Sequence, residues 1–112
     1  MAAYVIARIS IHDPERYTEY TKRTPRVLHQ YNGRFVARGS NVATLEGPVE
    51  ARRIVVLEFA NAEAAKAFYF SPEYTKIRTH RDASSDAEFI IVEAYPEEEW
   101  AAALAASQAV PD

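Results

Sequence analysis

Three charged side chains interrupt otherwise apolar stretches that alternate with the two-residue period of β-strands. They are Arg8, Arg38 and Glu58. If their strands are neighbours, the two guanidinium groups could bind a carboxylate or an enolate-like oxygen, and Glu58 could act as a base or hydrogen-bond acceptor. The same residues could instead form an arginine–glutamate network that only balances charges buried in an assembly. Both interpretations predict that the three side chains lie within reach of one another, and the first places them around one polar cavity.

A second group of candidate site residues lies near residue 80. Tyr74, His80 and Arg81 fall within two or three helical turns and could line the mouth of a ligand pocket, and a histidine has a pKa suited to proton transfer. A solvated helix face explains the same residues without any chemistry. Five tyrosines could stack on a planar ligand, although their helical spacing is more typical of core packing: Tyr17, Tyr20, Tyr31, Tyr69 and Tyr74.

No sequence pattern indicates a metal or a cofactor, and we expect neither. The three histidines lack metal-ligand spacing, cysteine is absent, and no glycine-rich phosphate loop or serine elbow is found. The net charge of −3 without a basic cluster argues against nucleic-acid binding. No leader and no run of about 18 apolar residues is found, so we expect no membrane association and a cytoplasmic location.

The candidate residues lie on a predicted βαββαβ order of elements. The expected strands are residues 4–11, 34–39, 53–59 and 87–95, with the second resuming at 42–46 after a bulge or bend at 39–41. Helices are expected to start at Asp13, Asn61 and Ser71, because each is a capping residue and two of them precede proline and an acid. Pro25 should kink or split the first helix.

This order predicts an α+β fold, a ferredoxin-like split βαβ sandwich whose antiparallel sheet has the strand order 4-1-3-2. Both main helices then cover one face of the sheet. The other face would carry Tyr4, Ile6, Ile54, Val56 and either Phe89 or Ile91, which is too apolar for water, so we expect a homodimer.

Two parts of the chain are distinguished by this pattern. Residues 1–95 are expected to form the ferredoxin-like domain, and residues 96–112 a C-terminal extension whose helix spans about 96–106. Trp100 and Leu104 lie one turn apart on that helix and are expected to dock on the body or on a partner subunit.

Several segments in this order resemble the bacterial family known as domain of unknown function 1330 (DUF1330), over about residues 4–95. They are Asp13-Pro-Glu-Arg-Tyr17 with Tyr20, Gly33-Arg-Phe-Val-Ala-Arg-Gly39, Leu45-Glu-Gly47, Arg53-Ile-Val-Val-Leu-Glu-Phe59, Glu63-Ala-Ala65, and Tyr69-Phe-Ser-Pro-Glu-Tyr74 followed by Arg81. Phe68 stands where the family usually has tryptophan, and Trp100 lies outside the family core. The resemblance implies a dimeric α+β barrel, in which two sheets face one another, but no established reaction.

The function expected from these observations is binding of a small anionic or carbonyl-bearing molecule by a homodimer. The alternative is a cofactor-independent enzyme, monooxygenase-like or isomerase-like, which rests on analogy with the dimeric α+β barrel superfamily. RNA recognition is disfavoured because the third strand lacks the aromatic run that stacks bases. An acylphosphatase is disfavoured because the turn at residues 10–13 has no glycine-rich phosphate nest.

Overall fold

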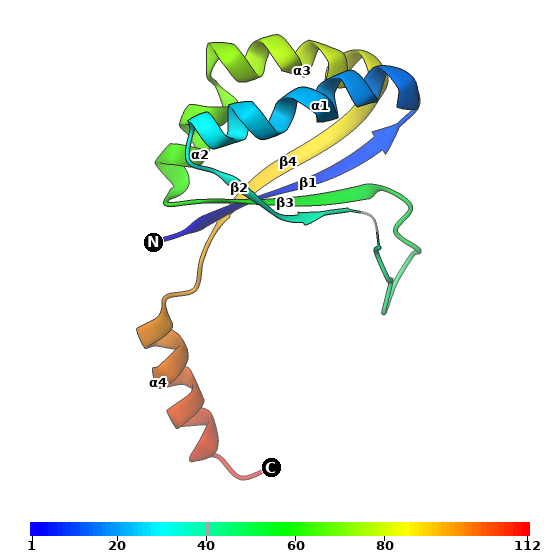
Figure 1. Cartoon of the computed structure of the whole chain (residues 1–112). Coiled ribbons are helices and arrows are strands. Elements are labelled where there is room, and N and C mark those ends of the chain that lie inside the picture. Colours follow the sequence, from blue (N-terminus) through cyan, green and yellow to red (C-terminus); the bar gives the residue numbers. More distant parts are fainter. Residues whose placement is uncertain (40) are drawn as a thin grey trace.

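A four-stranded antiparallel sheet forms one layer of the protein, and helices cover one of its faces (Figure 1). The computed structural model describes residues 1–39 and 41–112. Its elements in chain order are β1 (Ala3–Ile11), α1 (Pro14–Gln30), β2 (Arg34–Arg38), β3 (Arg53–Phe59), α2 (Ala62–Tyr69), α3 (Pro72–Ser84), β4 (Ser85–Glu93) and α4 (Glu97–Gln108). The strand order is β2-β3-β1-β4, so the predicted order 4-1-3-2 is confirmed.

The three predicted helix starts within the body are confirmed by their caps. In each case the side chain of the capping residue accepts a hydrogen bond from the backbone N–H three positions later, which satisfies a donor that the first helical turn leaves free. The donors are Arg16 to Asp13 (3.1 Å), Ala64 to Asn61 (2.8 Å) and Tyr74 to Ser71 (3.0 Å).

Pro25 does not split α1, which runs unbroken from Pro14 to Gln30. A proline has no N–H, so the carbonyl of Thr21, four residues earlier, loses its usual helical donor. The guanidinium Nη2 of Arg38 donates to that carbonyl instead, at 3.1 Å. A side chain from β2 therefore replaces the hydrogen bond that Pro25 removes.

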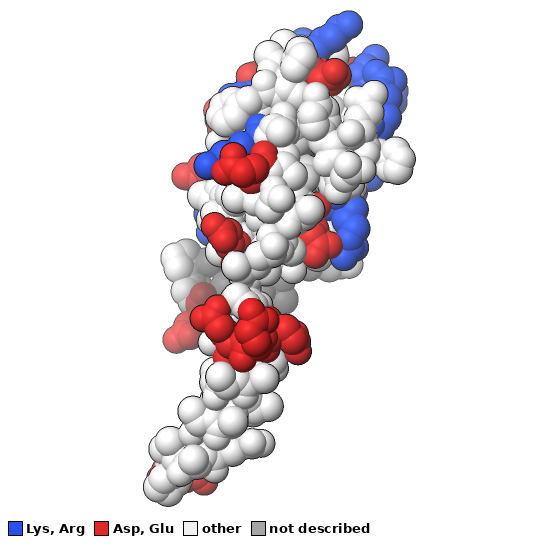
Figure 2. Space-filling model, turned by 90° about the vertical axis from the view of Figure 1, so that its left-hand side faces the viewer, with Lys and Arg blue, Asp and Glu red and all other residues white. Residues whose placement is uncertain are grey.

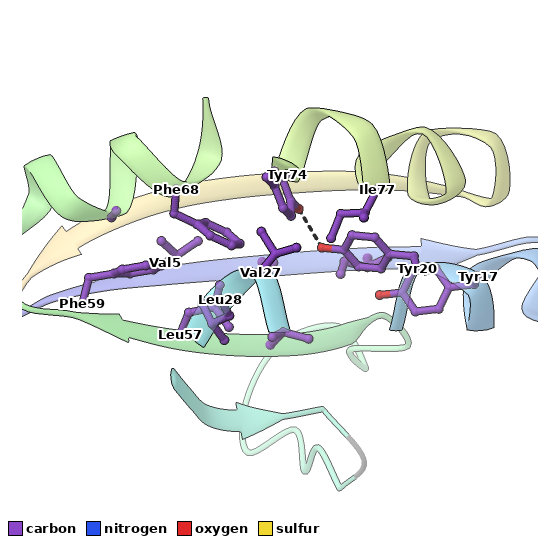
Figure 3. Packing of buried hydrophobic residues seen from close by; sticks show 14 residues of the cluster. Val5, Tyr17, Tyr20, Val27, Leu28, Leu57, Phe59, Phe68, Tyr74 and Ile77 are labelled. Atoms are coloured by element: carbon purple, nitrogen blue, oxygen red, sulfur yellow. Dashed lines mark hydrogen bonds between the residues drawn. The ribbon is translucent and has the colours of Figure 1, made fainter. Parts of the chain in front are cut away.

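The core lies between the sheet and the helices, and it combines aliphatic side chains with a group of packed aromatic rings (Figure 3). Tyr74 is fully buried, and its ring centroid lies 4.5 Å from that of Phe68 and 5.5 Å from that of Tyr69. The hydroxyls of Tyr20 and Tyr74 are hydrogen-bonded at 2.6 Å, the dashed line in Figure 3. This bond ties α1 to α3 inside the apolar layer.

Both ends of β2 depend on glycine. A Cβ on Gly33 would come within 2.5 Å of the Phe59 ring, so the chain leaving α1 can pass over β3 only without a side chain there. Gly39 has a φ of +72°, and a Cβ there would meet the carbonyl oxygen of Ile54 at 2.5 Å. The chain turns away from β3 at this point.

The expected continuation of β2 over residues 42–46 is wrong. These residues have no regular secondary structure, and Leu45 and Val49 are almost fully exposed. Once Gly39 has turned the chain, nothing remains for those apolar side chains to pack against. The bulge or bend expected at 39–41 includes Ser40, which lies outside the described residues.

The second face of the sheet, here called the open face, carries no helix (Figure 1). Its central side chains follow from the strand register, in which Tyr4 pairs with Val92 and Ile6 with both Val56 and Ile90. The expectation that Phe89 or Ile91 lies on this face is wrong, because the register of β4 turns both towards the helices. Ile90 and Val92 take their place and are 48% and 45% exposed.

The C-terminal helix α4 projects away from the body and buries none of its residues (Figure 1). Trp100 and Leu104 are 52% and 42% exposed, so the expected docking on the body of the same chain is wrong. Figure 2 shows acidic side chains gathered at the start of α4, where Glu97, Glu98 and Glu99 form the first turn, and a stretch of uncharged surface between them and the acidic tip.

The bond between Arg38 and the Thr21 carbonyl can be tested with a double-mutant cycle. Arg38→Ala should lower the free energy of unfolding by about 1 kcal/mol, because it leaves that carbonyl without a donor. In a Pro25→Ala background the N–H of the new alanine can donate to the Thr21 carbonyl, so Arg38→Ala should lower the free energy of unfolding by clearly less. Denaturant unfolding of the four proteins measures this. Arg34→Ala is the control and should cost the same in both backgrounds. An equal cost of Arg38→Ala in both would contradict the compensation.

Candidate functional site

The three charged residues predicted to surround one cavity do not lie together. Arg38 pairs with Val55, whose side chain is buried under the helices, whereas Arg8 and Glu58 lie on the open face. The register shifts between Phe35 and Ala37, so the bulge at Val36 reverses the face of every residue after it. The prediction of a common cavity for Arg8, Arg38 and Glu58 is therefore wrong.

Arg8 and Glu58 share the open face but are far apart along it. Arg8 pairs with Ile54 and Glu58 with Tyr4, a separation of four residues, or about 13 Å at the rise of a β-strand. Glu58 instead accepts a hydrogen bond from Arg34 at 2.7 Å. The open face thus has charges at its two ends and an apolar centre.

The other end of the open face carries a cluster of paired charges. Arg52 donates to Glu50 at 2.9 Å and to Glu88 at 2.7 Å, and Glu88 lies directly across from Arg8 in the register. Hydrogen bonds from Arg52 lower the pKa of Glu50 to about 2. These ion pairs fit the charge-balancing interpretation better than a ligand site.

Tyr74 and His80, the other predicted site residues, lie away from the pocket that Arg81 lines. Tyr74 is a core residue, fully buried between α1, α2 and the sheet. His80 faces α1, where its Nδ1 accepts a hydrogen bond from Arg16 Nε at 3.0 Å near the surface. The two residues and Arg81 share α3, but they point in different directions.

Arg81 differs from the other charged residues predicted for the site in its burial and its hydrogen bonding. It is only 4% exposed, and its Nε and Nη2 atoms are buried without a hydrogen-bond partner among the described residues. Its guanidinium carbon lies 4.4 Å from the centroid of the Phe89 ring. The nearest carboxylate, that of Asp82, is exposed and 3.7 Å away, too far for a hydrogen bond.

Arg81 lines a pocket of about 580 Å³ between α2, α3 and β4, here called the Arg81 pocket. This volume is in the range of small-molecule sites. Polar side chains in its wall come from Lys66, Arg78, Asp82 and Asp86, and aromatic ones from Tyr69, Phe70 and Phe89. Arg78 lies one helical turn before Arg81, and its guanidinium carbon is 5.1 Å from the Tyr69 ring centroid.

Sequence reasoning missed most of this pocket. The sequence pattern indicates Tyr69 only as a stacking residue and gives no sign that Lys66 and Phe89 line the same pocket as Arg78. The spacing of Arg78 and Arg81, three residues apart on a helix, was a usable signal, because such residues lie on one face. The buried state of Arg81 could not be read from the sequence.

The interior tyrosines are held in their neutral form. Burial raises the pKa of Tyr17 to about 12 and raises the pKa values of Tyr20 and Tyr74 as well. A neutral phenol can donate a hydrogen bond but is a poor base at neutral pH. These hydroxyls are therefore suited to structure and recognition more than to proton abstraction.

A small cavity of about 20 Å³ lies on the other side of Phe89, under α1. It is lined by Tyr17, Tyr20, Arg38 and Arg53, and the Nε of Arg53 is buried without a partner among the described residues. Its volume admits about one water molecule, which could accept that N–H. Phe89 separates this cavity from the Arg81 pocket, since its side chain lines both.

Among residues 1–39 and 41–112, no three His, Asp or Glu side chains are grouped so as to hold a metal ion. In the same part of the chain, no helix is both long and apolar enough to cross a membrane.

The sequence matches a family model, Domain of unknown function (DUF1330), over residues 2–95. The chain belongs to the DUF1330 family. The match confirms the resemblance read from the sequence segments and leaves α4 outside it. No curated protein matches the sequence.

Solved structures with the same fold support the ferredoxin-like assignment. A protein of unknown function from Rhodopseudomonas palustris is 19% identical with a TM-score of 0.70, covering 85% of this chain and 83% of its own. SnoaB, a cofactor-independent oxygenase from Streptomyces nogalater, is 17% identical (TM-score 0.62; 85% and 94% covered). A dimeric ferredoxin-like protein of unknown function from Jannaschia is 12% identical (TM-score 0.60; 84% and 100% covered). At these identities the likeness establishes the fold alone.

The raised tyrosine pKa values predict a loss of stability at alkaline pH. The unfolded chain ionises its tyrosines near pH 10, whereas folded Tyr17 holds its proton to about pH 12, so the stabilisation is complete below pH 10 and is lost as pH rises through this window. Tyr17→Phe should flatten the decline, with an expected difference of about fiftyfold in the folding equilibrium constant by pH 12, because the folded and unfolded pKa values differ by about two units. Urea unfolding at several pH values measures it. If the free energy of unfolding falls with pH equally in the two proteins, the raised pKa of Tyr17 is not the cause of the decline.

Proposed function

We propose that this DUF1330 protein is a homodimer that binds a small anionic or carbonyl-bearing molecule in the Arg81 pocket. The observation that carries the proposal is Arg81 itself, a buried cation in the wall of a ligand-sized pocket, with two nitrogens that lack hydrogen-bond partners among the described residues. A buried charge without a partner is costly, because burial removes its water without replacing the hydrogen bonds.

An acceptor oxygen in the pocket would relieve this cost. Arg81 cannot lose its proton at any ordinary pH, so it must remain a cation in the folded protein. Stacking on Phe89 compensates one face of the guanidinium group but not its N–H edge. A carboxylate or carbonyl oxygen of a ligand is the kind of partner that this edge lacks.

Binding has more support than catalysis. Deep in the interior the titratable groups next to Arg81 are tyrosines with raised pKa values, and His80 lies on the side of α3 that faces α1. Asp82 and Asp86 are the acids in the pocket wall, and Asp82 is half exposed and engaged by Arg78 at 3.2 Å. A cofactor-independent enzyme is therefore the second candidate function, and the fold shared with SnoaB supports it.

The homodimer is supported by the composition of the open face. Ile6, Val56, Ile90 and Val92 form an apolar centre, and the ion pairs of Arg34 with Glu58 and of Arg52 with Glu88 lie at its ends. An apolar centre with a charged rim is the usual composition of a protein interface. The related Jannaschia protein is described as dimeric.

Replacing Arg81 should separate ligand binding from stability. Arg81→Met keeps a similar length and removes a buried charge whose Nε and Nη2 have no hydrogen-bond partner among the described residues, so we expect the free energy of unfolding to stay equal or rise, while a retained ligand is lost. Native mass spectrometry of the purified wild type and variant tests this. Arg26→Met, on the exposed part of α1, is the matched control and should keep the ligand. A ligand that Arg81→Met retains at wild-type occupancy would overturn the site.

Placing a charge at the centre of the open face should break the dimer. Ile6 lies between Val56 and Ile90, so Ile6→Lys would bury an ammonium group in the interface, at a cost of several kcal/mol. Light scattering at micromolar concentration should give the mass of one 12.6 kDa chain for the variant and twice that for the wild type. Thr79→Lys, on α3, is the control. A monomeric wild type would refute the assembly.

A further inference from the structure

We infer that the ligand of the Arg81 pocket is an amphipathic monocarboxylate, whose carboxylate meets Arg81 and Arg78 and whose apolar body covers Phe70 and Ile91. This inference rests on the proposed function and narrows the chemical class of its ligand.

The polar end of the pocket is built from two stacked arginines. Arg81 lies over the Phe89 ring and Arg78 over the Tyr69 ring, at 4.4 and 5.1 Å from the ring centroids to the guanidinium carbons. Stacking on a ring covers one face of a guanidinium group and leaves the N–H donors at its edge free to bind an acceptor. The Nε of Arg78 already donates to Asp82 at 3.2 Å, so Arg78 can offer only its two terminal nitrogens to a ligand. Two such groups one helical turn apart present a fork that matches the two oxygens of a carboxylate.

The net charge of the pocket wall favours a single negative charge on the ligand. Lys66, Arg78 and Arg81 contribute +3, and Asp82 and Asp86 contribute −2, which leaves +1. A phosphate dianion or a dicarboxylate would bring more negative charge than this wall can balance. A monocarboxylate would neutralise it.

The apolar end of the pocket is left in contact with water. Phe70 is 75% exposed and Ile91 38%, and both line the same pocket as Arg81. Apolar side chains exposed next to a buried arginine are typical of a site that binds a molecule with a charged end and an apolar body. Acetate or another small anion would pair with Arg81 and leave this surface uncovered.

The length and the charge of the ligand can be varied separately by calorimetry on the full-length protein. Butanoate, hexanoate and octanoate form one series, benzoate and 2-naphthoate another, with acetate, inorganic phosphate and neutral octanamide as comparisons. We expect affinity to rise about fourfold for each buried methylene group, and octanamide to bind about tenfold or more weakly than octanoate. If affinity rises more steeply with size in the first series, the ligand is an aliphatic acid. If it rises more steeply in the second series, the ligand is an aromatic acid.

Variants of pocket residues test which end of the pocket binds the carboxylate and which binds the apolar body. Arg81→Met should abolish octanoate binding, and Phe70→Ala and Ile91→Ala should each weaken it several-fold without changing the binding of acetate. Val36→Ala, an exposed apolar change outside the pocket, is the control and should have no effect.

Two results would overturn the inference while keeping the proposed function. The first is an affinity that depends on Arg81 but is equal for acetate, phosphate and octanoate. The second is equal binding of octanamide and octanoate, which would indicate a neutral carbonyl ligand. Octanoate binding that Arg81→Met leaves unchanged would overturn both this inference and the proposed site.

Discussion

The position of α3 depends on one buried side chain, Tyr74. Its ring packs on Phe68 and Tyr69 of α2, and its hydroxyl is bonded to that of Tyr20 on α1. A buried hydroxyl needs a partner, so this bond fixes the rotation of α3 about its axis as well as its distance from α1. That rotation decides which side chains of α3 face β4. Arg78 and Arg81 are turned towards the pocket, and His80 is turned towards α1.

The sequence was informative where a regular period applied. Alternation along β1 and β3 predicted their buried faces, and capping residues at Asp13, Asn61 and Ser71 predicted three helix starts, because both signals act over a few neighbouring residues. The strand order and the family resemblance were confirmed as well. Predicting these features does not require knowing which distant segments of the chain are in contact.

The prediction of a common site was wrong because a single residue interrupts the two-residue alternation of β2. A single bulge at Val36 moves Arg38 to the helix face, where it bonds the carbonyl that Pro25 leaves free. Bulge and proline lie 11 residues apart in sequence, and neither alone shows that they compensate one another. The burial of Arg81 likewise depends on the packing of Phe89 from β4, a long-range contact that a helical period cannot indicate.

The edge strand β4 connects the two proposals, because neither of its faces is completed by the chain itself. Phe89, Ile90, Ile91 and Val92 form a continuous apolar run, which in a sheet is typical of a strand covered on both sides. Here Ile90 and Val92 lie on the open face, while Phe89 and Ile91 line the Arg81 pocket. Since these two surfaces lie on opposite sides of one strand, a single partner cannot cover both. A second subunit on the open face and a small amphipathic molecule under α3 would together bury the whole run, and this explains why residues 89–92 of an edge strand are all apolar.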